Sequence, residues 1–288
     1  MFSTLLGALP RPSDGPGDVL ASLASTGLEL LSTGEPPAGA DQPPASVVAA
    51  WQAAAGATDR PVKQVLAGPY TAGRDGAPSR PTQLAENLQA TVLALAEAGC
   101  PFVEVDESAA EAIAVVLGER RRFVEAHSRL LDGVAGTHVS LALTGANLDG
   151  AGAATFFDLP YASYAFDLIA GPDNWRLIAA APQDRGIVCG ALDPRPNGDE
   201  TRELLIWAAH YAASTNGRGS IRVGLANAPS LAPLDWPVAL RKLGRIAEAV
   251  RIASVESPEE MARLLDPRAF GGRRNRPGRV RFASPSEE

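Results

Sequence analysis

The fold is decided by the stretch Gly99-Cys100-Pro101-Phe102-Val103-Glu104-Val105-Asp106-Glu107-Ser108-Ala109. Its largely apolar run Phe102–Val105 predicts a buried strand, entered from a preceding helix that ends at Gly99. Buried strands of this kind belong to parallel α/β sheets, where ligands bind at the carboxyl ends of the strands. Asp106 and Glu107 stand at that end. We therefore expect functional chemistry there.

Eight short apolar runs recur along the chain and predict eight strands: Thr4–Leu9, Leu28–Thr33, Val62–Ala67, Phe102–Val105, His138–Leu143, Ser163–Ile169, Gly186–Leu192 and Ile221–Leu225. Segments with helical periodicity separate most of them: Ala45–Ala55, Thr82–Ala98, Glu111–Leu131, Asp173–Ala180, Glu200–Ala213 and Asp235–Ala253. The interval at residues 144–162 is Gly-rich and poorly periodic, so a short helix is expected there. Alternating strands and helices favour right-handed crossovers and a parallel sheet.

Eight strands favour closure into a barrel over an open sheet. No G-x-G-x-x-G follows the first run, which counts against a dinucleotide-binding fold. We predict an α/β protein with a single (β/α)8 TIM-type barrel over residues 1–265. Residues 266–288 are rich in Arg, Gly and Pro and are predicted to be a disordered basic tail.

Composition excludes several classes of function. The 288-residue chain carries a net charge of -7, which argues against a nucleic-acid surface in its main body. Its two cysteines, Cys100 and Cys189, lie in apolar runs, and no apolar run reaches the ~18–20 residues of a membrane span. The N-terminus lacks the features of a signal peptide. We expect a cytoplasmic protein with no membrane and no nucleic-acid partner.

Polar residues follow most of the predicted strands: Glu35, Tyr70, Thr71, Asp106, Glu107, Asp167, Asp193, Asn227 and Ser230, with His138 and Ser140 opening the fifth. A barrel would bring the carboxyl ends of its strands to one face. Each residue also has a structural interpretation. Asp106 and Glu107 could favour the N-terminus of a helix, and a histidine on an apolar strand is more often a hydrogen-bonded core residue.

The order of these motifs resembles the catalytic (C-terminal) domain of cobalamin-independent methionine synthase, in the methionine synthase/uroporphyrinogen decarboxylase-like barrel superfamily. Leu6-Gly7-Ala8-Leu9-Pro10 resembles its Gly-Ser-Phe-Pro opening, and Ser32-Thr33-Gly34-Glu35 its Thr-Asp-Gly-Glu segment. Val62-Lys63-Gln64-Val65-Leu66-Ala67-Gly68-Pro69-Tyr70-Thr71, Val105-Asp106-Glu107-Ser108-Ala109, Thr137-His138-Val139-Ser140 and Asn227-Ala228-Pro229-Ser230 follow in the family's order.

The resemblance implies that Glu35 and Asp106 hold an amino group of the substrate. It also implies a zinc site, whose His, Cys, Glu and Cys ligands correspond to His138, Ser140, Asp167 and Ser230. Serine hydroxyls are poor zinc ligands beside thiolates, so no zinc is expected and no residue is assigned to a metal. Ala8 replaces the serine that helps to bind the substrate carboxylate.

The predicted function is that of a zinc-free methyl- or alkyl-transferase acting on a small amino-acid-like or thiol substrate. His138 and Asp167 are the predicted general bases. The predicted substrate-binding residues are Glu35, Asp106, Ser140, Asn227 and Ser230. Methyltetrahydrofolate or methylcobalamin, the latter on a partner corrinoid protein, are the candidate methyl donors. The alternatives are a non-catalytic relative that binds an amino acid or folate, and a lyase on the same barrel.

Overall fold

The computed structural model describes residues 1–11, 19–198 and 201–265. The chain divides into two units, Met1–Ser254 and Val255–Glu288. In the second unit the described residues include helix α10 (Pro258–Leu265). The first unit ends before the barrel boundary predicted at residue 265, and the predicted tail at 266–288 lies outside the described residues.

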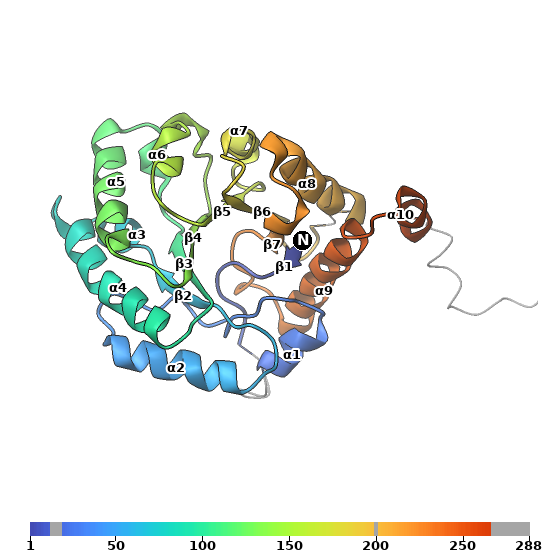
Figure 1. The fold of residues 1–288 in the computed structure, drawn as a ribbon, viewed down its shortest axis with the longest axis horizontal. Coiled ribbons are helices and arrows are strands. Elements are labelled where there is room, and N and C mark those ends of the chain that lie inside the picture. The colour runs from blue at the N-terminus through green and yellow to red at the C-terminus, as the bar shows by residue number, and fades with distance from the viewer. Residues whose placement is uncertain (12–18, 199–200, 266–288) are drawn as a thin grey trace, which may run out of the picture. The chain divides into compact units, whose positions relative to one another are not determined.

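The first unit is built on one sheet of seven parallel strands (Figure 1). The strand order is β1-β7-β6-β5-β4-β3-β2. The strands are β1 (Phe2–Ser3), β2 (Gln64–Ala67), β3 (Phe102–Glu107), β4 (His138–Leu143), β5 (Ser163–Asp167), β6 (Gly186–Leu192) and β7 (Val223–Asn227). The parallel α/β architecture predicted from the sequence is therefore confirmed.

The second of the eight predicted strands, Leu28–Thr33, does not form as a strand in the described residues. On the β2 side, Leu31 makes an isolated parallel bridge to Val62, and Ala38, beyond the segment, makes another to Leu66. Toward β1, the backbone amides of residues 29 and 30 donate to the carbonyl of Ser3 at 3.2 and 3.0 Å. The segment thus contacts both edges of the sheet, but a regular eight-stranded barrel is not confirmed.

Local backbone geometry explains this difference. Gly27 and Gly34 bound the apolar run, and both have positive φ angles, 92° and 71°. Such residues turn the chain and interrupt an extended ladder. Pro36 and Pro37 follow directly and lack the amide donors that a ladder needs.

Helices flank the sheet and connect successive strands (Figure 1). They are α1 (Val19–Ser25), α2 (Pro44–Gly56), α3 (Pro69–Gly73), α4 (Arg80–Glu97), α5 (Leu117–Leu131), α6 (Ala154–Phe157), α7 (Trp175–Ala180), α8 (Arg202–Ser214) and α9 (Trp236–Ala253). The predicted stripe of α4 is buried, with Leu88, Val92 and Leu95 fully inaccessible. Within the described ranges, no helix has the length and apolar character needed to cross a membrane.

Two of the intervals between strands can be compared directly with the helices predicted for them. The predicted helix at Glu111–Leu131 is broken: a single 3-10 turn occupies Glu111–Ala114, and α5 begins at Leu117. The β-branched pair Val115 and Val116 lies at this break and disfavours a continuous helix. The Gly-rich interval at 144–162 contains a 3-10 turn and the four-residue α6, so the expectation of a short helix is confirmed.

Small side chains fill the centre of the sheet's inner face. The core cluster there consists of Leu6, Ala142, Ala165, Val188 and Ala226, with the partly buried Phe2 packed against it. The alanines, on β4, β5 and β7, and Val188 on β6 are buried in this middle layer. The carboxyl and amino ends of the strands are therefore separate places for polar chemistry.

Candidate functional site

Asp106 lies near the carboxyl end of β3 and is 9% exposed. Its Oδ1 atom is buried and has no hydrogen-bond partner among the described residues. Burial, together with the charges of Glu104 and Glu107, raises the pKa of this carboxyl to about 7, and the charge of Lys63 opposes the shift. Buried polar atoms are almost always paired in native proteins. An unpaired carboxylate oxygen at a strand end therefore indicates a place where a ligand atom or water binds.

A buried ion pair accompanies Asp106. Lys63 Nζ lies 2.6 Å from Glu104 Oε2, and the two side chains are 0% and 2% exposed. The same ammonium donates to the carbonyl of Leu5 at 2.6 Å, while Glu104 Oε1 has no hydrogen-bond partner in the part of the chain described. Buried ion pairs of this kind cost desolvation energy and are weak evidence for stability. Glu104 lies two residues before Asp106, so a functional role is the better explanation for this buried ion pair.

Lys63 and Glu104 were not among the residues predicted from the sequence, although a signal was present. Both lie inside apolar runs, and lysine occurs only at positions 63 and 242 in the whole chain. Charged residues in buried parallel strands are rare unless they are paired. A lysine on one predicted strand and a glutamate on another could therefore have been read as partners.

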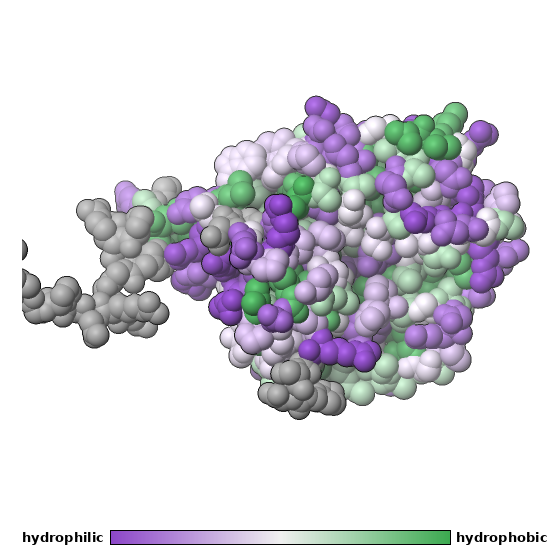
Figure 2. All heavy atoms as spheres, turned by 180° about the vertical axis from the view of Figure 1, so that it is seen from behind, coloured by the Kyte–Doolittle hydropathy of each residue, from purple (hydrophilic) through white to green (hydrophobic). Residues whose placement is uncertain are grey.

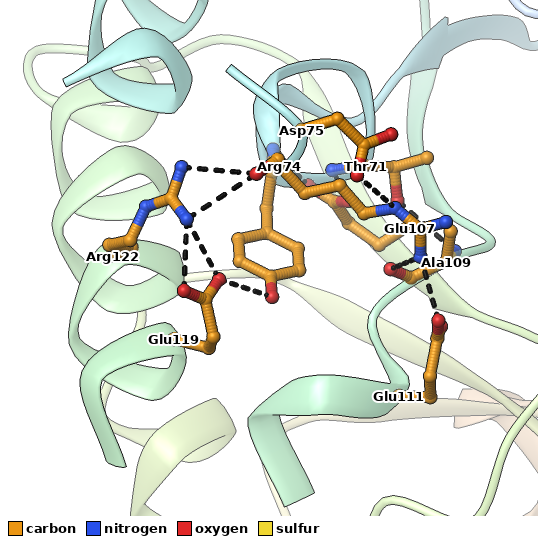
Figure 3. A network of polar contacts seen from close by, with 9 residues as sticks. Thr71, Arg74, Asp75, Glu107, Ala109, Glu111, Glu119 and Arg122 are labelled. Atoms are coloured by element: carbon orange, nitrogen blue, oxygen red, sulfur yellow. Dashed lines mark hydrogen bonds and ion pairs between the residues drawn. The ribbon is translucent and has the colours of Figure 1, made fainter. Parts of the chain in front are cut away.

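Glu107 points to the other side of β3 and has a structural role (Figure 3). Its carboxylate accepts hydrogen bonds from the backbone amides of Tyr70 (2.9 Å) and Thr71 (2.6 Å), at the N-terminus of α3. Its Oε1 also lies 2.9 Å from Nε2 of the buried His127 on α5. The helix-terminus interpretation of this acidic pair therefore holds for Glu107, but the helix is α3 and not the one that follows.

A polar network extends from this helix terminus toward α5 (Figure 3). The Tyr70 hydroxyl donates to Glu119 at 2.8 Å, and Arg122 donates to the same carboxylate at 2.9 Å. Arg74 pairs with Glu111 at 2.7 Å. Burial and the neighbouring Glu119 carboxylate raise the pKa of Tyr70 above its usual range. The Tyr70–Glu119 bond joins α3 to α5, and the charged groups named here are paired with one another.

Asp167 ends β5, and its carboxylate is fully buried. Oδ2 accepts from the amide of Gly145 at 2.9 Å, and Oδ1 accepts from the amides of Ile169 and Ala170, both at 2.8 Å. These three bonds join the loops that follow β4 and β5. The carboxylate of Asp167 therefore has a structural role, holding these two loops together through their backbone amides.

His138 and Ser140 lie in the first half of β4, away from its carboxyl end. His138 Nε2 is 2.7 Å from the Ser163 hydroxyl, which donates to Ser140 at 2.8 Å. The imidazole stacks on Phe102, with ring centroids 4.5 Å apart, and burial lowers its pKa. Ser140 pairs with Ser163, four residues before Asp167. The structure therefore does not bring His138 or Ser140 together with Asp167.

The strand register explains this separation. Asp106 pairs with Ala142, and Leu143 pairs with Phe166 beside Asp167. The inward positions at the carboxyl end of β4 are thus Ala142 and the following Thr144, which is 6% exposed. His138 and Ser140 open the strand, as predicted, so they lie toward its amino end and away from Asp167, which ends β5.

Asn227 and Ser230 hold the segment after β1 against β7. The Asn227 side chain accepts from the amide of Leu6 at 3.2 Å and donates to the Leu6 carbonyl at 2.8 Å. Ser230 donates to the carbonyl of Ala8 at 2.8 Å. Both residues therefore lie where the segment after β1 meets the end of β7, and their side chains are hydrogen-bonded to backbone groups.

Glu35 is exposed and lines a cavity of about 270 Å³ together with Ala8, Leu9, Arg11, Thr33 and Trp236. Asp106 is not among the described residues that line this cavity. The structure thus places the two predicted amine-binding carboxylates in different surroundings, Glu35 beside solvent and Asp106 in the interior.

The four positions that correspond to the zinc ligands do not fit a zinc site. His138 lies at the start of its strand, Asp167 is occupied by three amides, and Ser230 is bonded to a carbonyl. No group of three or more His, Cys, Asp and Glu side chains that could hold a metal occurs within residues 1–11, 19–198 and 201–265. The reaction proposed below therefore does not use zinc.

Comparison with solved structures finds the same architecture in several enzymes. A B12-independent methionine synthase from a Shewanella species, in complex with selenomethionine, matches with a TM-score of 0.71 and 14% identity, over 87% of this chain and 96% of that one. A putative vitamin-B12 independent methionine synthase from Listeria monocytogenes matches with a TM-score of 0.67 and 13% identity, over 87% and 97%. A D-allulose 3-epimerase from Methylomonas, in complex with D-allulose, matches at 0.59 and 14%, over 87% and 96%.

At these identities the likeness shows the fold. No protein-family model and no curated protein matches the sequence. The resemblance to methionine synthases that the motifs indicated is thus supported structurally, while epimerases share the architecture. The function must be argued from the residues of this chain.

Proposed function

We propose that this protein binds a small ligand with a protonated amine at the carboxyl ends of its strands, with Asp106 as the ammonium-binding carboxylate. The observation that carries the proposal is the buried, unpartnered Oδ1 of Asp106 beside the Lys63–Glu104 ion pair. An ammonium group would satisfy that oxygen and would compensate the burial of its charge. On the face seen in Figure 2, hydrophobic areas are small and separated by polar residues, which fits a small-molecule ligand better than a broad apolar partner.

The proposed reaction class is methyl or alkyl transfer to the bound ligand without zinc. Its support is the order of the motifs together with the fold shared with methionine synthases. A carboxyl with a pKa of about 7 is suited to accept a proton near neutral pH. A bound ammonium would lower that pKa, so Asp106 is assigned to ammonium binding; the contacts of His138 and Asp167 engage them elsewhere. Methyltetrahydrofolate and methylcobalamin remain the proposed donors, the second carried by a corrinoid partner.

A second candidate is ligand binding without turnover. It is favoured by Asp167, whose carboxylate is occupied by three backbone amides and is not poised as a base. The two candidates share the amine site and differ only in whether the bound ligand is alkylated. Mass spectrometry of the ligand after incubation with each methyl donor separates them.

The amine site is tested by calorimetry with L-methionine and L-homocysteine against their analogues that lack the amino group. We expect the amines to bind more tightly, and Asp106→Asn to weaken them by about 2–5 kcal/mol, because a buried charged hydrogen bond is lost. Binding should strengthen from pH 6 to pH 8 as Asp106 ionises, since the amine stays protonated over that range.

Asp132→Asn is the matched control, because this carboxylate is 73% exposed and pairs only with Arg129 on the surface in the described contacts. It should leave the affinity unchanged. Equal affinity of wild type and the Asp106→Asn variant for an amine ligand would rule out the assignment of Asp106.

A further inference from the structure

A second cavity, of about 370 Å³, lies at the amino ends of the strands. It is lined by Phe102, His138, Ser163, Arg185, Ile221 and Arg222, among others, and is called here the amino-end cavity. Phe102 and His138 are the first residues of β3 and β4, whereas Asp106 is near the end of β3. The amino-end cavity is therefore separate from the proposed amine site.

One wall of the amino-end cavity is flat and apolar. The rings of Phe102 and His138 stack at 4.5 Å with an interplanar angle of 20°, and the Ser163 hydroxyl fixes the imidazole. Phe2 also lines the cavity and packs against the central alanine cluster. Gly224 makes room for this ring, since a Cβ atom there would lie 2.7 Å from Phe2 Cζ. Ring faces and edges of this kind favour a flat ligand.

The rim adds an exposed hydrophobic residue. Ile221 lines the amino-end cavity and is 82% exposed. A large aliphatic side chain that borders a cavity provides apolar area that a bound ligand would remove from water. Together with the stacked rings, it makes the cavity apolar on more than one side.

The charged groups of the amino-end cavity are predominantly cationic. Arg185 and Arg222 face one carboxylate, that of Asp184, which is 63% exposed and lies 3.8 Å from an Arg185 terminal nitrogen. The Nε atom of Arg185 is buried, and no described residue accepts a hydrogen bond from it. A buried guanidinium donor without an acceptor is an unmet requirement that an anionic ligand would satisfy.

We propose that the amino-end cavity binds a small anion with a flat apolar body, of the aromatic carboxylate class. The carboxylate is held by Arg185, with Arg222 adding positive charge, and the ring lies against the stacked Phe102 and His138. Asp184 competes for Arg185, so it weakens the site. The ligand is bound at the end of the sheet opposite the proposed amine site and does not depend on it.

The probe is 4-fluorobenzoate, followed by fluorine NMR, with 4-fluorobenzamide as the neutral analogue of the same shape. Wild type should broaden and shift the benzoate signal at millimolar probe and leave the benzamide signal nearly unchanged. Arg185→Gln should weaken benzoate binding by about tenfold, because it removes the charge that pairs with the carboxylate. Asp184→Asn should tighten it a few-fold, because the competing carboxylate is gone.

The two variants give opposite signs, so a general loss of folding cannot imitate the expected pattern. Asp106→Asn should leave benzoate binding unchanged. The proposal is overturned if benzoate does not bind at about 10 mM, a limit that corresponds to negligible affinity. It is also overturned if Arg185→Gln binds like wild type, or if binding is lost in Asp106→Asn and kept in Arg185→Gln. That last result would place the anion at the other end of the sheet.

Discussion

Lys63→Met is expected to lower the free energy of unfolding by about 3–5 kcal/mol, because it leaves Glu104 charged, buried and unpaired. Lys63 Nζ and Glu104 Oε2 are 2.6 Å apart, and neither side chain has appreciable contact with water. The substitution also removes the donor to the Leu5 carbonyl. Urea denaturation monitored by circular dichroism measures the change.

The double variant Lys63→Met, Glu104→Leu should recover most of the lost stability, because an apolar pair of similar volume needs no desolvation of charge. Arg129→Met is the exposed control. It breaks the surface pairs of Arg129, which is 41% exposed, with Glu86 and Asp132, which are 54% and 73% exposed, and should cost less than about 1 kcal/mol. A Lys63→Met variant within about 1 kcal/mol of wild type would contradict an ionised, buried Lys63–Glu104 pair.

Asp106→Asn is expected to stabilise the protein at pH 8 while it impairs amine binding. The pKa of the carboxyl is about 7 in the folded chain against 3.8 for an unburied one. Between these values the native state keeps a proton that the unfolded state has released. The free energy of unfolding therefore falls as the pH rises from about 4 to about 7, by up to about 4 kcal/mol from this group.

The asparagine variant lacks this loss, so the stability difference between variant and wild type should be small at pH 4 and reach a few kcal/mol by pH 8. Chemical denaturation of both proteins at several pH values measures that difference, and other titrating groups cancel in it. A difference that does not change with pH would contradict the raised pKa. Residues that lower stability and are nevertheless present are expected at binding sites.

The carboxyl end of β3 could be predicted from the sequence because its signals are local. A helical stripe, a glycine stop, an apolar run and two acidic residues occur within one stretch. The strand β3 begins at Phe102 as predicted, but it continues past Val105 to include Asp106 and Glu107. The opposite facing of Asp106 and Glu107 follows from the two-residue period of a strand. That Glu107 and not Asp106 binds the N-terminus of α3 could not be predicted. The helix α3 (Pro69–Gly73) has only five residues, which is too short to show a helical periodicity in the sequence.

The candidate site was less predictable because it depends on register and on distant partners. His138 opens its strand, as predicted, and its pairing with Phe102 places it at the amino end of the sheet, away from Asp106. Lys63 and Glu104 are 41 positions apart and meet only when β2 and β3 pair. Leu28–Thr33 has the composition of a strand, but the glycines at its ends interrupt it.

The titration of the Asp106 carboxyl carbon by NMR, without and with a saturating amine ligand, tests the central claim most directly. The Asp106→Asn variant assigns the signal. We predict a pKa of about 7 in the free protein. A bound ammonium should lower the pKa by about 1–3, because an adjacent positive charge favours the carboxylate. A free pKa near that of an ordinary aspartate, or one that the amine ligand leaves unchanged, would contradict the account.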